Sequence, residues 1–146
     1  MKRIVLFCIA ITVSFYISGQ TTKNVYVSTA GTLNTLLTEN EANNVTSLVI
    51  SGNVDARDFA FVRDKAKAVS IIDMSSTSII AYKGIDGTNT GVDTEYPANE
   101  IPSYAFYNPV LKTYKQKLVS FKFPTSTKSI GYLAFNYCWN LSGIVS

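Results

Sequence analysis

A recurring triplet of apolar residues, spaced as L-x-x-L-x-L, most constrains how this chain can fold. In its first copy the three positions are Val45, Leu48 and Ile50, and the later copies follow at offsets of 24, 49 and 23 residues. The last two apolar residues alternate with outward positions, as in a strand with one buried face. One such strand cannot bury its apolar face alone, so the offsets predict stacked repeats. Strands are expected near residues 45–50, 69–74, 118–123 and 141–146.

The segments between the expected strands carry helix signals. Asp55 is a good N-cap residue, and Phe59, Val62 and Ala66 follow on one helical face. TLNTLLTENEA (32–42) has an apolar stripe of leucines and predicts a helix that covers the end of the stack. We therefore expect an N-terminal cap region at 20–44, repeats at 45–146, and a polar loop insertion near 84–99.

The N-terminus has the pattern of an export signal. Lys2 and Arg3 precede an apolar run of 14 residues from Ile4 to Ile17, and small residues follow. The run is short for a membrane span, which needs about 20 apolar residues. We expect a signal peptide at residues 1–19, cleaved near Gly19/Gln20, and a secreted or cell-surface protein without a transmembrane span. An uncleaved anchor is the alternative.

Cleavage would leave Cys138 as the single cysteine of the mature chain, since the other cysteine, Cys8, lies in the signal. No internal disulfide could then form. In SIGYLAFNYCWNL (129–141), the spacing of Ala134, Phe135 and Cys138 suggests one face of a short helix. Cys138 is therefore predicted to be a small buried core residue, and a reactive thiol is the alternative.

The composition speaks against several function classes. The chain has no histidine, the commonest general base and metal ligand. Without Lys2 and Arg3 it holds 11 basic and 10 acidic residues, which gives no electrostatic case for nucleic acid. We expect no catalytic residues, no metal and no cofactor.

Two acidic groups leave alternatives open. Asp55 and Asp58 could be the paired acids of a glycan-active enzyme, but capping of a helix start is the favoured interpretation. The polar loop at 84–95 could offer oxygen ligands to calcium, although a solvated insertion is favoured. Its candidate ligands are Asp86, Asn89, Asp93 and Glu95.

A partner is expected on the outward positions of the strands, where neighbouring repeats would stack into columns. Asp73 and Lys122 would be near neighbours there. The candidate binding residues are Ser47, Val49, Ser70, Ile71, Asp73, Val119, Ser120 and Lys122. Tyrosines in or near the loops offer a second set of contacts, with partial burial as the alternative. These are Tyr82, Tyr96, Tyr104, Tyr107 and Tyr114.

The segment FKFPTSTKSIGYLAFNYCWNLSGI (121–144) resembles the BspA-type leucine-rich repeat of bacterial surface and secreted proteins. The positions that match its pattern are Pro124, Ser129, Ile130, Gly131, Ala134, Phe135, Cys138 and Leu141. EIPSYAFYN (100–108) keeps Ile101, Ala105 and Phe106 but has Pro102 where the pattern has glycine. Residues 33–94 resemble the N-terminal part of exported Bacteroides-type proteins that carry such repeats.

The resemblance implies an α/β fold, a right-handed leucine-rich-repeat solenoid with an N-terminal helical cap. Because the last triplet stops at Ser146, we expect this solenoid to be truncated at the C-terminus. It also implies an exported module that binds a protein or host-surface macromolecule without catalysis. Two alternatives remain: a non-autonomous fragment of a longer repeat array, and a glycan-active enzyme.

Overall fold

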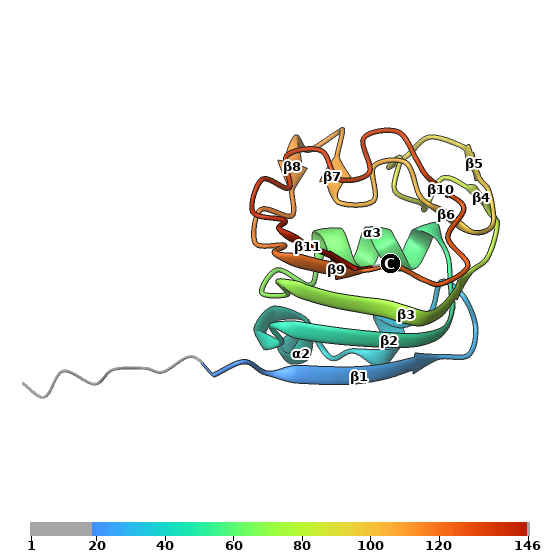
Figure 1. The fold of residues 1–146 in the computed structure, drawn as a ribbon. Helices are drawn as coiled ribbons and strands as arrows, with labels where there is room; N and C mark the ends of the chain where they lie inside the picture. Colours follow the sequence, from blue (N-terminus) through green and yellow to red (C-terminus); the bar gives the residue numbers. More distant parts are fainter. Residues whose placement is uncertain (1–18, 146) are drawn as a thin grey trace, which may run out of the picture.

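The computed structural model describes residues 19–145, so the expected signal peptide lies outside the described residues except for Gly19. Its main feature is a five-stranded sheet in the order β1-β2-β3-β9-β11, in which every neighbouring pair is parallel (Figure 1). The strands are β1 (Thr22–Val27), β2 (Ser47–Val54), β3 (Ile71–Ile79), β9 (Ser120–Lys122) and β11 (Gly143–Val145). Four of them lie within or beside the expected segments, and β1 was not predicted.

Short helices and small sheets connect these strands. The helices are α1 (Leu33–Leu36), α2 (Glu39–Asn44) and α3 (Ala56–Asp64). Two antiparallel pairs are β4 (Tyr82–Gly84) with β5 (Thr94–Tyr96), and β7 (Tyr107–Asn108) with β8 (Thr113–Tyr114). One parallel pair joins β6 (Glu100–Ile101) and β10 (Ser129–Ile130). Among the described residues no helix has the length and apolar character to cross a membrane.

The hydrophobic core lies on one face of the large sheet. Alternate residues of β1, β2 and β3 and the central residue of β9 are buried there, as Leu48 and Ile50 show in β2. They form one cluster with Phe59 of α3 and with Phe106, which precedes β7. Figure 1 shows α2 behind β2, while the opposite face of β1, β2 and β3 carries no other described element. The sheet is therefore covered on one side only.

Helix α3 forms where its caps and apolar spacing predict it. The Asp55 carboxylate accepts a hydrogen bond from the Arg57 N–H at 2.9 Å, and Asp58 completes a capping box by accepting from the Asp55 N–H. Phe59, Val62 and the following Ala66 are buried in the core. The predicted helical face behind Asp55 is thus confirmed.

The expected leucine-rich-repeat solenoid is wrong. Residues 19–145 form a small β-rich domain with one five-stranded parallel sheet and three two-stranded sheets, and they contain no solenoid. Parallel strands need connections of a dozen or more residues, so regular strand spacing does not require identical coils. Here a helix joins β2 to β3, whereas residues 80–119, with β4 to β8, join β3 to β9. Connections so unequal are not identical coils, although parts of two of them pair as β6 and β10.

Two helix predictions also need correction. The expected helix at 32–42 is split into α1 and α2, because Thr38 caps a second helix in a capping box with Glu41. The expected helix within 129–141 is a series of turns, in which Leu133 and Tyr137 have positive φ angles of 51° and 60°. Cys138 is nevertheless buried as predicted, and burial raises the pKa of its thiol to about 11.

Candidate functional site

The outward residues of the large sheet stand in rows across the strands. One row aligns Ser47 with Ile71, and Ile71 with Ser120. The next row aligns Val49 with Asp73, and Asp73 with Lys122. Ser70 and Val119 precede β3 and β9, and the Val119 N–H donates to the Ser70 carbonyl at 2.8 Å. The structure therefore brings all eight candidate binding residues together where strands β2, β3 and β9 begin.

Exposure differs within this candidate set. Val119 is 38% exposed, but Ser47 is buried at 5%, so the expectation that Ser47 is exposed is wrong. Its small side chain lies on a central strand, between Thr22 of β1 and Ile71 of β3. The other candidates are half-buried: Val49, Ser70, Ile71, Asp73, Ser120 and Lys122.

Tyr26 on β1 belongs to the same face and was missed. Its side chain is 68% exposed, and it pairs in register with Ser51 of β2. The sequence NVYV (24–27) holds the signal, because Val25 and Val27 alternate with outward positions. Because no strand was predicted at 22–27, Tyr26 was not assigned to the outward face of the sheet.

The pair of Asp73 and Lys122 is close, as predicted, with Nζ and Oδ2 3.4 Å apart. Asp73 also accepts hydrogen bonds from the Ser75 N–H at 2.9 Å and the Ser75 hydroxyl at 2.6 Å. Partial burial raises the pKa of the Asp73 carboxyl, but these hydrogen bonds and the Lys122 charge outweigh it. The pKa therefore lies below its ordinary value, and Asp73 is a fixed negative charge on the open face.

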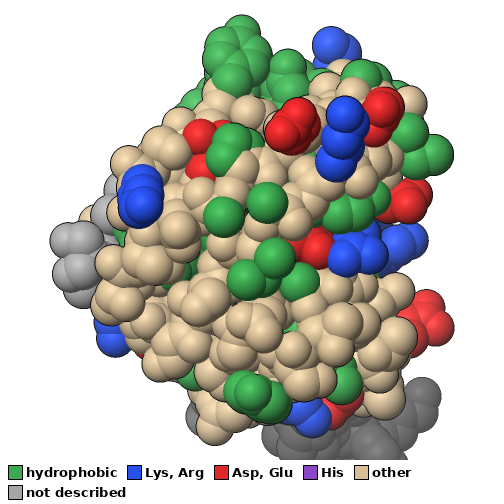
Figure 2. All heavy atoms as spheres, turned by 90° about the vertical axis from the view of Figure 1, so that its right-hand side faces the viewer, with side chains coloured by type: hydrophobic (Ala, Val, Ile, Leu, Met, Phe, Trp, Pro, Cys, Tyr) green, Lys and Arg blue, Asp and Glu red, His purple; other side chains and the backbone are tan. Residues whose placement is uncertain are grey.

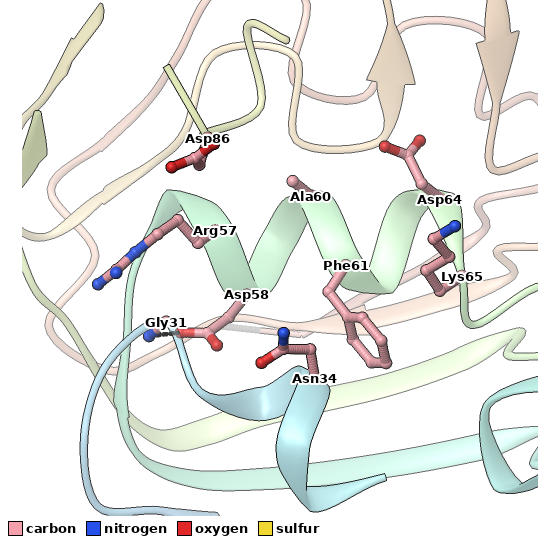
Figure 3. Close-up of a pocket in the computed structure, with 9 residues that line it drawn as sticks. All are labelled: Gly31, Asn34, Arg57, Asp58, Ala60, Phe61, Asp64, Lys65 and Asp86. Carbon is pink, nitrogen blue, oxygen red and sulfur yellow. Dashed lines mark hydrogen bonds between the residues drawn. The ribbon is translucent and has the colours of Figure 1, made fainter. Parts of the chain in front are cut away.

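A hollow of about 400 Å³ lies along α3 (Figure 3). The residues that line it are Gly31, Asn34, Arg57, Asp58, Ala60, Phe61, Asp64, Lys65 and Asp86. Both Asp58 oxygens are occupied, since they accept from the N–H groups of Gly31 (2.6 Å), Leu33 (2.9 Å) and Asp55 (2.9 Å). Burial raises the pKa of the Asp58 carboxyl even though these three donors lower it.

Asp55, the other acid considered for glycan cleavage, also has its carboxylate oxygens engaged in hydrogen bonds. Asp55 accepts from the Arg57 backbone and from the Arg57 guanidinium, whose shortest contact is 2.6 Å. The guanidinium also lies 4.6 Å from the centre of the Tyr82 ring. Asp55 and Asp58 therefore act as caps that tie the segment at 30–33 to α3. Within residues 19–145 no three carboxylate, thiol or imidazole groups are placed to hold a metal ion.

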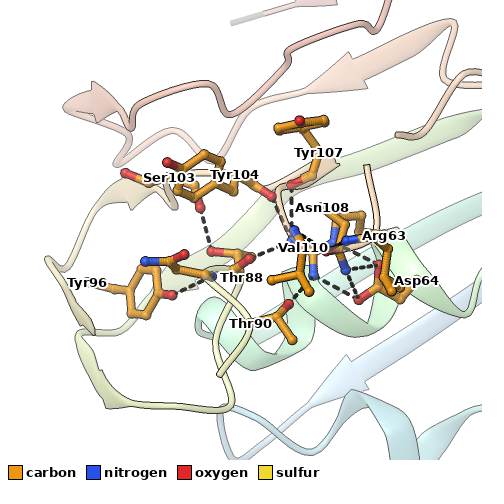
Figure 4. A network of polar contacts seen from close by, with 12 residues as sticks. Arg63, Asp64, Thr88, Thr90, Tyr96, Ser103, Tyr104, Tyr107, Asn108 and Val110 are labelled. Carbon is orange, nitrogen blue, oxygen red and sulfur yellow. Dashed lines mark hydrogen bonds and ion pairs between the residues drawn. The ribbon is translucent and has the colours of Figure 1, made fainter. Parts of the chain in front are cut away.

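Arg63 at the other end of α3 holds the connecting segments together (Figure 4). Its side chain is fully buried and donates to the carbonyls of Thr88 (2.6 Å), Tyr104 (3.0 Å) and Tyr107 (3.2 Å). Asp64 balances its charge at 2.8 Å. This network is structural, and it fixes the position of the β7–β8 hairpin.

Four aromatic side chains gather beside that hairpin, and we call them the aromatic cluster: Tyr107, Tyr114, Tyr137 and Trp139. Ring centroids of Tyr137 lie 5.6 Å from Tyr107, 5.4 Å from Tyr114 and 5.7 Å from Trp139. Trp139 is 75% exposed, the highest value among the large hydrophobic side chains that the structure describes. Tyr107 and Tyr114 were among the expected contact residues, whereas Tyr137 and Trp139 were missed, although YCW (137–139) places them two apart.

The charges on the visible surface are mixed. Figure 2 shows basic and acidic side chains beside one another, with hydrophobic side chains in small separate groups. Such a face has no continuous basic patch of the kind that nucleic acid requires.

No family model matches this chain, and no curated protein matches it. The resemblance to BspA-type repeats therefore stays a prediction.

Proposed function

We propose that this chain is a non-catalytic binding module of an exported protein, and that the open face of its five-stranded sheet holds a protein partner. The observation that carries the proposal is the single-sided cover of the sheet. One face is packed against the helices, and the other presents ordered rows of side chains to solvent.

The composition of the open face supports a protein partner. Val49 and Ile71 are half-buried and adjoin the charged pair of Asp73 and Lys122. Tyr26 stands at one side of this centre, largely exposed. Apolar centres with polar surroundings and a prominent tyrosine are typical of protein–protein interfaces.

The state of the acidic residues supports a role without catalysis. Asp55 and Asp58 are the pair considered for glycan cleavage. Their carboxylate oxygens accept hydrogen bonds from backbone N–H groups and from Arg57. A general acid or nucleophile needs an oxygen free to meet its substrate. The apolar N-terminal run behind Lys2 and Arg3 supports export, which makes a host or microbial surface protein the proposed partner.

A matched pair of tyrosine substitutions tests the proposal. The purified chain is measured against immobilised extracellular-matrix and cell-surface proteins by surface plasmon resonance. Tyr26→Ser should weaken binding by about tenfold or more, because an exposed aromatic anchor is lost. Tyr132→Ser is the control, since Tyr132 is also 68% exposed but lies outside the large sheet. Equal affinity of both variants and the parent would rule out the open face as the binding surface.

A further inference from the structure

A basic hollow lies beside Tyr114, and none of the eight candidate binding residues of the sheet lines it. Its volume is about 220 Å³, and its lining contains four basic residues and no acidic one. The lining residues are Arg63, Lys67, Tyr114, Lys115, Gln116 and Lys117. A second hollow of about 290 Å³ shares Arg63, Lys67 and Tyr114. Asp64 lines this second hollow, but Arg63 and Asn108 already occupy its carboxylate. Arg63 and Asp64 therefore balance each other, and Lys67, Lys115 and Lys117 leave the recess positive.

Lys115 is the unusual member of this lining. Lys115 is only 5% exposed, and its ammonium group donates a hydrogen bond to the Ala66 carbonyl at 2.5 Å. An ammonium carries three protons, and no carboxylate of the described residues forms an ion pair with it. Burial, and to a lesser extent Lys117, lowers the Lys115 pKa to about 8. An anion in the hollow would relieve this cost by pairing with the buried charge.

The aromatic cluster adjoins the hollow through Tyr114, which belongs to both. The Tyr114 ring centroid lies 5.4 Å from that of Tyr137 and 6.3 Å from that of Trp139. Asn140 ties the two parts together, because its amide donates to the Gln116 carbonyl at 2.8 Å. Exposed aromatic rings and ammonium groups are thus held within one surface region.

We propose that the hollow beside Tyr114 and the aromatic cluster form a binding site for an acidic glycan. Its carboxylate or sulfate groups lie among Lys67, Lys115 and Lys117, and its sugar rings stack on Tyr137 and Trp139. A sugar ring has an apolar C–H face that suits the negative face of an aromatic ring, and its anionic groups suit ammonium donors.

The backbone around the hollow favours a glycan over an acidic peptide. The N–H groups of Lys115, Gln116 and Leu118 already donate to carbonyls of Phe106, Tyr114 and Lys115, at 2.9, 3.0 and 3.0 Å. A peptide that binds as an added strand needs such donors free. A glycan needs only ring faces and side-chain charges, which this region supplies. The proposal is independent of the open sheet face, so either one can fail without the other.

Trp139 is the only tryptophan of the chain and serves as the reporter. The purified chain is titrated with oligogalacturonate as the carboxylated probe and dextran sulfate as the sulfated probe. Neutral dextran and poly-glutamate are the comparison ligands. We expect a change in Trp139 fluorescence with one or both acidic glycans, at most a weak one with poly-glutamate, and none with dextran. The two acidic probes distinguish carboxylate from sulfate recognition.

Calorimetry on variants separates this site from general attraction between charges. Trp139→Ala should weaken glycan binding by about tenfold, and the double variant Lys67→Gln/Lys117→Gln by at least as much. The control, Lys83→Gln/Lys128→Gln, makes the same change in net charge at two exposed lysines outside the hollow and should bind like the parent. Equal losses in both double variants would overturn the proposal, as would poly-glutamate binding as tightly as the glycans or full affinity of Trp139→Ala.

Discussion

Single carboxylates fix much of the local structure of this chain by accepting hydrogen bonds from backbone N–H groups. Asp58 accepts from three such groups, of which the most distant in sequence belong to Gly31 and Leu33. Asp55 caps α3, Glu41 completes the capping box of α2 with Thr38, and Glu41 also pairs with Lys23 at 2.5 Å. A buried N–H without an acceptor costs free energy. Hydrogen bonds from these carboxylates to the backbone therefore affect stability more than exposed ion pairs do.

Asp58→Ala should lower the free energy of unfolding by about 3 kcal/mol, because it removes a cap and leaves buried N–H groups without acceptors. Asp58→Asn should lose less, since the amide oxygen still accepts. Urea denaturation followed by circular dichroism measures both. Asp86→Ala is the control, because Asp86 lines the same hollow but is exposed. A loss with Asp58→Ala no larger than with Asp86→Ala would contradict the capping role.

The carboxyl group of Glu41 leads to a prediction about the stability of the chain at low pH. Hydrogen bonds from Lys23 and Thr38 lower the pKa of its carboxyl from 4.5 to about 2. Its contribution to stability is therefore complete above pH 4.5 and is lost as the pH falls towards 2. Glu41→Gln should be less stable than the parent at pH 7, and the difference should disappear near pH 2. Urea denaturation at several pH values measures this.

Glu39→Gln is the matched control for Glu41. Glu39 lies on the same helix but forms no ion pair among the described residues. At pH 7 its substitution should lower the free energy of unfolding by less than Glu41→Gln does. A stability difference for Glu41→Gln that stays constant down to pH 2 would show that the difference does not come from the ionised carboxylate.

At the scale of elements, the four strands that carry the apolar triplets were easier to predict than the segments between them. Alternating burial depends on the strand alone, so Leu48 and Ile50 revealed β2 whatever followed it. Helix spacing is less specific. In the turns at 131–140 the N–H of Ala134 donates to Gly131 and that of Cys138 to Phe135, three residues back in each case. Successive turns of this kind place apolar residues at helix-like intervals, which explains the wrong helix prediction.

The contact between α3 and the β7–β8 hairpin depends on Arg63. Arg63→Lys should destabilise the chain by about 3 kcal/mol, because a lysine cannot reproduce the planar set of donors and leaves buried carbonyls unpaired. Hydrogen exchange should show the segment 84–108 losing protection before the large sheet does. This order is expected because Arg63 contacts Thr88, Tyr104 and Tyr107 but not β1 or β2.

Arg57→Lys is the control for Arg63. It lies on the same helix, but its side chain is 39% exposed and its main partner is the neighbouring Asp55. Its effect on stability should be below that of Arg63→Lys, with no selective loss of protection at 84–108. Uniform exchange over the whole chain in Arg63→Lys would show that the hairpin is held by its apolar contacts instead.

At the scale of the molecule, the sequence predicted which residues align across strands but not how the chain closes around them. The alignment of Val49, Asp73 and Lys122 followed from the triplet offsets. The aromatic cluster did not, because Tyr114 and Tyr137 are brought together only by packing of the connecting segments. The connections between strands are unequal, which the triplet spacing did not reveal, and a solenoid was inferred from spacing that a single parallel sheet also satisfies.

The connecting segments and the large sheet should unfold as one unit, because Phe106 joins them. Its buried ring lies 6.2 Å from Phe59 of α3, 5.3 Å from Phe121 of β9 and 5.1 Å from Phe135. Phe106→Ala should lower the free energy of unfolding by about 4 kcal/mol through lost burial and the cavity left behind. Leu111→Ala, at a site 65% exposed, should change it by less than about 0.5 kcal/mol.

Cooperativity provides the decisive measurement for this arrangement. Urea denaturation of the parent should give coincident transitions by far-ultraviolet circular dichroism, which reports the large sheet and α3, and by the fluorescence of Trp139 in the aromatic cluster. The two transitions should shift together in Phe106→Ala, since one core cluster contains residues of both parts. An early aromatic transition in the parent, with the sheet persisting, would mean that residues 80–117 fold as a separate layer. The shared core predicts a single transition instead, because Phe106 cannot lose its contacts without exposing Phe59 and Phe121.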